Sequence, residues 1–193
     1  MKRPLLAAAL TLALTSTAAG AATQGGLKTA VFAGGCFWSA EHAMEKLPGV
    51  RDVVVGYAGG ASKNPTYQRH AGHLEAVKVT YDPTKISYAK LVDGFFHNID
   101  PTDPNGQICD QGPSYRTAVF AADAGERQTA EAVKAQVART LRRPVATQVL
   151  PAATFWKGEA YHQDYARKNP LNYNAYRIGC GRDRALKAVW SGK

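Results

Sequence analysis

The sequence predicts a single α+β domain, a ferredoxin-like two-layer sandwich in which helices cover a mixed sheet. Up to Ala121 the predicted elements follow the order β-α-β-β-α-β, which is the split βαβ arrangement. No internal repeat or low-complexity linker divides the chain, and residues 22–193 are enough to enclose one hydrophobic core. A further helix and strand follow, and then an irregular C-terminal tail.

The first half of the chain supplies three strands and two helices. Apolar or β-branched runs predict the first two strands, and strict alternation predicts the third. Pro48 and Gly49 end the first helix, and Ser87 caps the second, which carries Leu91, Val92, Phe95 and Phe96. In chain order we expect a strand at 28–33, a helix at 37–47, strands at 50–57 and 74–81, and the helix after Ser87.

The second half begins with a long segment, residues 99–115, that has no periodicity. Segments of this length inside a compact domain are usually functional. Beyond it we expect a strand at 116–121, a helix from Asp123 to about Leu141, a strand at 146–150 and a short helix at 159–168. The tail from Asn169 is expected to be irregular.

The first residues have the pattern of a secretory signal peptide. Lys2 and Arg3 precede the short apolar run Leu5–Leu14, and small residues at Ala19 and Ala21 offer a cleavage site. We expect a signal peptide at 1–21, a catalytic domain at 22–193, and a periplasmic or secreted protein. An uncleaved anchor is the alternative, although the apolar run is too short to span a membrane.

The chain is basic, with a formal net charge of +9. Nucleic acid could explain such a charge, but an exported protein rarely meets it, and no aromatic residues are interleaved with the arginines of the tail. We therefore interpret the charge as a solvated basic face. No nucleic-acid partner, no stable membrane association and a monomer are expected.

Three cysteines are present, Cys36, Cys109 and Cys180. Export implies an oxidising compartment, where disulfides persist, and an odd number leaves at least one thiol unpaired or in exchange. No C-x-x-C pair exists, and no histidine pair has metal-ligand spacing with an acidic third ligand. No metal site is expected.

Cys36 follows two glycines in the stretch AVFAGGCFW, at a predicted strand-to-helix turn. A free cysteine is often only a small buried hydrophobe. A helix N-terminus, however, favours the thiolate and lowers a thiol's pKa, so this position favours a nucleophile. Glu75 adds a second unusual group, because alternation places it on one face with valines, where it lies at an open strand end or has a raised pKa.

Several motifs in order resemble the A-type peptide-methionine sulfoxide reductases. They are GCFW (35–38), NPTY (64–67), GHLEAV (72–77), YDP (81–83), SYRTA (114–118) and YHQDYARKNP (161–170). The match covers roughly Ala30 to Pro170, nearly the whole predicted domain. This resemblance implies a thiol reductase that acts on the S epimer of methionine sulfoxide, free or in proteins.

The resemblance also implies a role for each matching residue. Cys36 aligns with the nucleophile, Glu75 with the acid, and Tyr67 and Tyr115 with tyrosines that bind the sulfoxide oxygen. Asp110 aligns with a substrate-site aspartate, and Phe37 and Trp38 form an apolar cup for the S-methyl group. Attack by Cys36 releases methionine and leaves a sulfenic acid on Cys36.

A second thiol has to remove the sulfenic acid. Cys180, between Gly179 and Gly181, is the expected choice, and the resulting Cys36–Cys180 disulfide would be reduced by thioredoxin or a thioredoxin-like dithiol, with no bound cofactor. The loop before Tyr115 departs from the family pattern, because Cys109 stands where many relatives have asparagine. Cys109 is therefore a rival resolving thiol.

Two other classes of function remain open from the residues. A thiol hydrolase would need Cys36 with His73 or His162 and with Asp110. A non-catalytic binding protein with an incidental thiol would need none of these. Otherwise no catalytic role is expected for the histidines, and His162 is expected to pack or to take part in hydrogen bonding.

Overall fold

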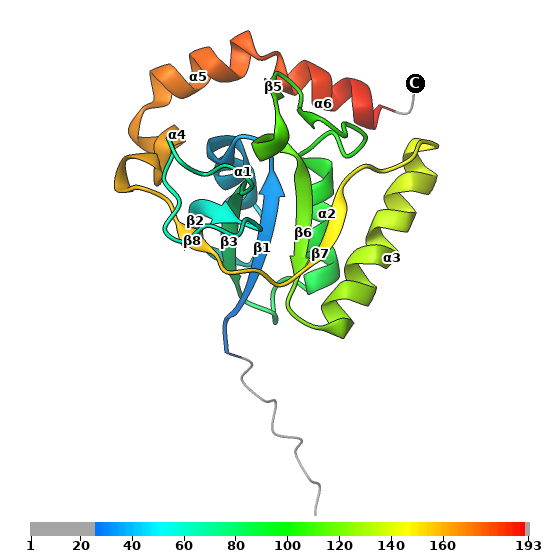
Figure 1. The fold of residues 1–193 in the computed structure, drawn as a ribbon. Helices are drawn as coiled ribbons and strands as arrows, with labels where there is room; N and C mark the ends of the chain where they lie inside the picture. The colour runs from blue at the N-terminus through cyan, green and yellow to red at the C-terminus, as the bar shows by residue number, and fades with distance from the viewer. Residues whose placement is uncertain (1–25, 192–193) are drawn as a thin grey trace, which may run out of the picture.

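The computed structural model describes residues 26–191, which form eight strands and six α-helices (Figure 1). The expected signal peptide at 1–21 lies outside the described residues. The strands are β1 (Lys28–Gly34), β2 (Val50–Ala58), β3 (Leu74–Tyr81), β4 (Gly106–Gln107), β5 (Asp110–Gln111), β6 (Thr117–Ala121), β7 (Gln148–Pro151) and β8 (Trp156–Lys157).

Six of these strands form one mixed sheet in the order β7-β6-β1-β3-β2-β8. The pairs β1–β3, β1–β6, β2–β3 and β2–β8 are antiparallel, and only β6–β7 is parallel. The short strands β4 and β5 form a separate hairpin. The predicted α+β class with a mixed sheet is confirmed.

The helices α1, α2 and α3 pack together on one face of the sheet. The helices are α1 (Phe37–Met44), α2 (Tyr88–His97), α3 (Ala124–Leu141), α4 (Tyr165–Lys168), α5 (Pro170–Gly179) and α6 (Arg182–Trp190). Two single 3-10 turns lie at Pro113–Tyr115 and Ala160–His162.

The alternation of β3 divides its side chains between two cores. Val77, Val79 and Tyr81 join the main core under the helices, whereas Leu74 and Ala76 join a smaller cluster on the other face. Glu75 lies two residues before Val77, so its side chain points to the same face of the sheet, which the helices cover. It is the second residue of β3.

The C-terminal tail is not irregular, and this part of the prediction is wrong. Residues after Asn169 form α5 and α6, and Gly181, at φ 64°, makes the turn between them. The side chain of Arg182 is buried and donates to the carbonyl of Asn98 (2.8 Å), and Trp190 Nε1 donates to the carbonyl of Ile99 (3.1 Å). These bonds fasten α6 to the free carbonyls that end α2.

The segment 159–168 is also shorter in helix than expected, since a single 3-10 turn is followed by the four-residue α4. Figure 1 shows α5 and α6 lying across the end of the sheet toward which β1 runs, next to the β4–β5 hairpin. Residues 99–115, α5 and the start of α1 therefore meet at one end of the sheet. Among residues 26–191, no helix has the length and apolarity that a membrane crossing requires.

Candidate active site

Cys36 stands at the N-cap position of α1, directly after β1. Its backbone carbonyl accepts the N–H groups of Ser39 (3.0 Å) and Ala40 (3.2 Å), which begins the helix. Gly35 has φ of 79°, and a Cβ at this position would collide with the side chain of Gln107. The glycine thus permits both the turn and the close approach of the loop that carries Cys109 and Asp110.

The pKa of Cys36 is raised to about 12, so the expectation that the helix N-terminus lowers the pKa of this thiol is wrong. Burial is the main cause, because the residue is only 7% exposed, and the negative charges of Glu75 and Asp110 add to it. The Tyr176 hydroxyl and the Trp38 backbone N–H offset part of the shift. Burial beside two carboxyls outweighs the helix N-terminus, so the sulfur is held as a thiol.

Glu75 supplies the cap that Cys36 does not. Its Oε2 accepts the backbone N–H of Phe37 at 2.9 Å, at the first position of α1. The side chain is 1% exposed, and burial raises the pKa of Glu75 to about 7, although the bond from Phe37 opposes the shift. At neutral pH this carboxyl is therefore present in both the protonated and the ionised form, as a general acid requires.

Tyr67 and Tyr115 reach the same place from different segments. Tyr67 lies in the loop between β2 and β3, and Tyr115 ends the 3-10 turn before β6. Both residues line the pocket that holds Cys36, and burial raises the pKa of both phenols. Both therefore stay protonated at neutral pH and are available as hydrogen-bond donors.

These groups surround one pocket of about 220 Å³. The pocket contains seven of the eight residues that the sequence selected, Cys180 being the exception, together with one residue that it did not select. The lining residues are Cys36, Phe37, Trp38, Tyr67, Glu75, Asp110, Tyr115 and Tyr176. A nucleophile, an acid, two phenols and an apolar wall thus converge on a space that fits a small group.

His162 supports the apolar wall and does not reach the thiol. Trp38 Nε1 donates to His162 Nδ1 at 3.1 Å, and the Trp38 ring stacks on Tyr165 with centroids 3.7 Å apart. Since Nδ1 accepts a bond and burial lowers the pKa of His162, the ring is neutral. The expected hydrogen-bonding role of His162 is confirmed.

The second histidine of the hydrolase alternative, His73, is also engaged elsewhere. It is buried, and its Nδ1 accepts the backbone N–H of Gly60 at 3.2 Å. No imidazole lines the pocket of Cys36 within residues 26–191. The arrangement therefore lacks the base that a cysteine hydrolase needs on its thiol.

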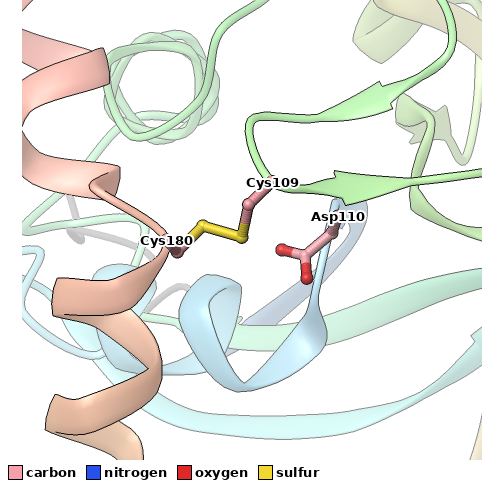
Figure 2. Close-up of side chains that lie close together, drawn as sticks. All are labelled: Cys109, Asp110 and Cys180. Atoms are coloured by element: carbon pink, nitrogen blue, oxygen red, sulfur yellow. A yellow bond between two sulfur atoms is a disulfide. The ribbon is translucent and has the colours of Figure 1, made fainter.

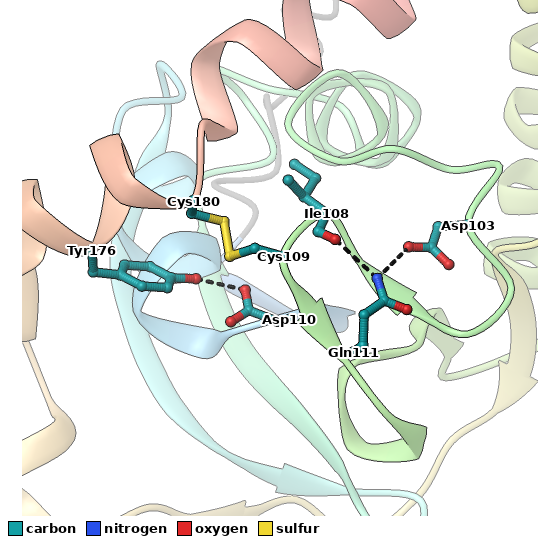
Figure 3. The surroundings of a disulfide bond; sticks show 7 residues. All are labelled: Asp103, Ile108, Cys109, Asp110, Gln111, Tyr176 and Cys180. Atoms are coloured by element: carbon teal, nitrogen blue, oxygen red, sulfur yellow. Dashed lines mark hydrogen bonds between the residues drawn. A yellow bond between two sulfur atoms is a disulfide. The ribbon is translucent and has the colours of Figure 1, made fainter.

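The cysteines are paired differently from the expected Cys36–Cys180 disulfide. Cys109 and Cys180 form a disulfide, with Cα atoms 5.3 Å apart (Figure 2). Cys36 is free. Cys109 is exposed and Cys180 partly buried. Asp110, next to Cys109, accepts a bond from the Tyr176 hydroxyl at 2.6 Å (Figure 3). The disulfide thus lies directly behind one wall of the pocket.

Two residues that organise the site were not found from the sequence. Tyr176 is one, because its segment was expected to be irregular. Glu159 is the other: its carboxylate accepts the Tyr67 backbone N–H (2.8 Å) and the Tyr57 hydroxyl (2.9 Å), which fixes the loop that carries Tyr67. The Asn169-Pro170 pair could have indicated Tyr176, since proline favours the first turn of a helix.

Comparison with known proteins gives one consistent result. The sequence profile described as peptide methionine sulfoxide reductase matches residues 28–193. Peptide methionine sulfoxide reductase MsrA 2 of Caulobacter vibrioides is 50% identical over 197 residues, which cover 100% of both chains.

Solved structures agree with the sequence comparison. Methionine sulfoxide reductase A of Corynebacterium diphtheriae superposes with a TM-score of 0.72 at 34% identity, covering 77% of this chain and 78% of that one. Mxr1 from Saccharomyces cerevisiae in complex with Trx2 has a TM-score of 0.52 at 26% identity, covering 72% and 85%. With the pocket, the profile match and these relatives together, this chain belongs to the peptide methionine sulfoxide reductase family.

Proposed function

We propose that this oxidoreductase reduces methionine sulfoxide to methionine through attack of the Cys36 sulfur on the sulfoxide sulfur. The observation that carries the proposal is the pocket that joins a buried thiol, a carboxyl with a pKa of about 7 and two phenols. A sulfoxide oxygen is a poor leaving group until it is protonated. Glu75 is the proton donor, and Tyr67 and Tyr115 hold the oxygen as charge develops on it.

The step balances within the pocket. Neutral Glu75 gives its proton to the sulfoxide oxygen while the sulfur of Cys36 attacks. Attack forms a bond between the Cys36 sulfur and the sulfoxide sulfur. The protonated oxygen then passes to the Cys36 sulfur, so that the bonds from the substrate sulfur to oxygen and to Cys36 both break and methionine leaves. Glu75 recovers a proton from the Cys36 thiol, so the products are methionine and a Cys36 sulfenic acid. Because the thiol proton returns to Glu75, the high pKa of Cys36 is compatible with the reaction.

The walls of the pocket support a preference for one epimer, the S sulfoxide. Phe37 and Trp38 lie on one side, and the Trp38 ring is fixed by His162 and Tyr165. An S-methyl group fits against these rings while the oxygen points to the phenols. With the methyl and oxygen positions fixed, the two epimers direct the rest of the side chain to opposite sides of the sulfur, so one pocket accepts one epimer. The family resemblance implies that this is the S epimer.

Regeneration of Cys36 uses the other two cysteines. Cys180 condenses with the sulfenic acid to give a Cys36–Cys180 disulfide and water. The Cys109 thiol then attacks the Cys180 sulfur and releases the Cys36 thiol, which leaves the Cys109–Cys180 disulfide. This outcome is supported by the pairing in the structure, where Cys36 is free.

A thioredoxin-like dithiol is the reductant. Mxr1 of Saccharomyces cerevisiae has been solved in complex with Trx2, which supports the same kind of partner here. Cys109 is the more exposed residue of the pair, so the incoming thiolate attacks the Cys109 sulfur and the Cys180 sulfur leaves. The second thiol of the partner then resolves the mixed disulfide and carries away both electrons. A thioredoxin variant without its second cysteine should be trapped on Cys109, as peptide mapping would show.

The test of the mechanism is single-turnover analysis without a reductant. Fully reduced enzyme should release about two methionines per chain from the S epimer, because the first turnover closes Cys109–Cys180 and the second oxidises Cys36. The R epimer should remain. In the same assay Cys36→Ser should release no methionine and Cys180→Ser should release about one. When thioredoxin is supplied, Cys180→Ser should still stop after this first methionine.

Cys109→Ser is the matched variant for the recycling step. With Cys109 in the final disulfide, this variant should also stop with thioredoxin, at a Cys36–Cys180 disulfide that peptide mapping detects. Normal cycling of Cys109→Ser would remove Cys109 from the pathway. Release of methionine by folded Cys36→Ser would overturn the assignment of the nucleophile.

We propose further that residues 1–21 are a signal peptide and that the enzyme repairs oxidised proteins in the periplasm or outside the cell. The basic start, the short apolar run and the small residues before Ala22 support this. An accessible disulfide also suits an oxidising compartment. Expression in a bacterial host followed by N-terminal sequencing of the periplasmic fraction tests it, and a cytoplasmic protein that retains Met1 would contradict it.

A further inference from the structure

Two links join the same two segments behind one wall of the pocket. Cys109 and Asp110 are neighbours at the β4–β5 hairpin, and Tyr176 and Cys180 lie one turn apart along α5 and its C-cap. The disulfide joins Cys109 to Cys180, and a 2.6 Å hydrogen bond joins Asp110 to the Tyr176 hydroxyl. Figure 3 shows the two links side by side.

Tyr176 takes part in one of these two links and also lines the reaction pocket. It lines the pocket together with Cys36, and its ring packs edge-on to Trp38 with centroids 6.3 Å apart. Among the described residues of α5, only Tyr176 lines the pocket. One wall of the pocket is therefore supplied by the segment that carries Cys180.

We propose that the Cys109–Cys180 disulfide holds Tyr176 in the sulfoxide pocket, so that Tyr176 is a substrate-contacting residue whose position depends on the redox state of the recycling cysteines. The inference rests on the proposed function. Closing the disulfide prearranges the wall, and a prearranged site loses less conformational entropy when it binds. When a dithiol partner reduces the disulfide to two thiols and is itself oxidised, one of the two links is lost.

We expect the loss of the disulfide to loosen only the end of α5, around Tyr176 and Cys180. Tyr173 is buried on the same helix, and Arg182 and Trp190 keep α6 bonded to the carbonyls after α2. These contacts do not involve the disulfide. Reduction should therefore loosen the pocket wall without releasing the C-terminal helices.

Coupling of this kind is reciprocal. If the disulfide form binds sulfoxide more tightly, then sulfoxide must favour the disulfide by the same factor. A threefold difference in affinity corresponds to a reduction potential of the Cys109–Cys180 couple that is lower by about 14 mV when sulfoxide is bound, since tenfold equals 29.6 mV for two electrons. Two independent measurements therefore report one coupling.

The experiment uses Cys36→Ser in the full domain, which blocks chemistry and leaves only the recycling pair to titrate. N-acetyl methionine S-sulfoxide is titrated by calorimetry into the disulfide form and into the form reduced with a phosphine. We expect at least about threefold tighter binding to the disulfide form. Adding Tyr176→Ala should remove this difference, and adding Tyr161→Ala, at an exposed tyrosine outside the pocket, should preserve it.

Equal affinity of the two redox forms would overturn the inference, as would a difference that survives Tyr176→Ala. The redox comparison alone needs no change at Tyr176, so it decides the matter even if that variant does not fold. Absence of sulfoxide binding in both forms would overturn the proposed function as well. Binding that is equal in both forms would leave the proposed function intact.

Discussion

Two buried glutamates, Glu75 beside the start of α1 and Glu41 within α1, have the same shifted pKa and different surroundings. Glu75 and Glu41 are each 1% exposed, and burial raises the pKa of each to about 7 against the pull of backbone N–H donors. Glu75 accepts the N–H of Phe37, while Glu41 accepts the N–H groups of Asp164 (2.8 Å) and Tyr165 (3.3 Å).

The difference lies in what else each carboxyl meets. Glu75 faces a pocket with a thiol and two phenols, whereas Glu41 lines no part of that pocket and holds the chain before α4 against α1. A raised pKa therefore does not by itself identify a catalytic acid. A catalytic acid is identified by a nucleophile, hydrogen-bond donors for the oxygen and a pocket beside it. Comparing variants of Glu75 and Glu41 tests this within one protein.

The largest effect is expected from Glu75→Gln. The amide still fits the site but cannot donate an acidic proton, so the rate of methionine release in a single turnover should fall by about 10²-fold or more. Glu41→Gln is the matched control and should change this rate by less than about threefold. Rapid-quench measurement of methionine decides, and an equal loss in both variants would mean that the rate follows buried charge in general.

The two phenols opposite Glu75 should give the next largest effect. Tyr67→Phe and Tyr115→Phe each leave one donor on the oxygen, so each should slow the first step several-fold. The double variant should lose much more than the product of the single losses, because a lone oxygen donor in such a site is worth about 10²-fold or more. A double-mutant cycle measures the coupling, and strictly additive effects would argue against a shared oxygen.

Much of the fold follows from local pattern. Alternation in β3, the Ser87 cap of α2 and the glycines before Cys36 each have a direct physical cause in the chain, and each was correctly interpreted. The tail was not, because its order comes from contacts distant in sequence. Arg182 and Trp190 bond to carbonyls more than eighty residues away, and no local signal reports them.

The site divides in the same way. The order of the motifs along the chain identified Cys36 and its neighbours in the pocket. Their pKa values could be judged only from the three-dimensional structure. Position at a helix N-terminus predicted a low pKa for Cys36, and burial beside Glu75 and Asp110 reversed it. The pairing of Cys109 with Cys180 was equally open, because spacing along the chain does not determine which of three sulfurs meet.

The pH dependence of the first step should separate Glu75 from Glu41. The neutral form of Glu75 is the reactive one and its pKa is about 7, so the single-turnover rate should be constant near pH 6 and fall about tenfold by pH 8. The fall should persist in Glu41→Gln and vanish in Glu75→Gln. A rate that instead rises through pH 7 would mean that ionisation of Cys36 limits the reaction.

The smallest effect concerns stability and isolates Glu41. Its pKa is about 7 in the folded state and near 4.5 when unfolded, so the folded state retains a proton that the unfolded state loses. The stability contributed by the neutral carboxyl is therefore full below about pH 4.5 and decreases as the pH rises toward 7. Glu41→Gln does not titrate, and its single acceptor oxygen costs it part of one backbone hydrogen bond at every pH. Urea unfolding should thus show the variant gaining about 1 to 3 kcal/mol relative to the parent between pH 5 and pH 8, whatever its starting value. Glu75 titrates in both proteins and cancels from the comparison, so parallel stability curves would mean that Glu41 is ionised in the folded protein and that burial does not raise its pKa.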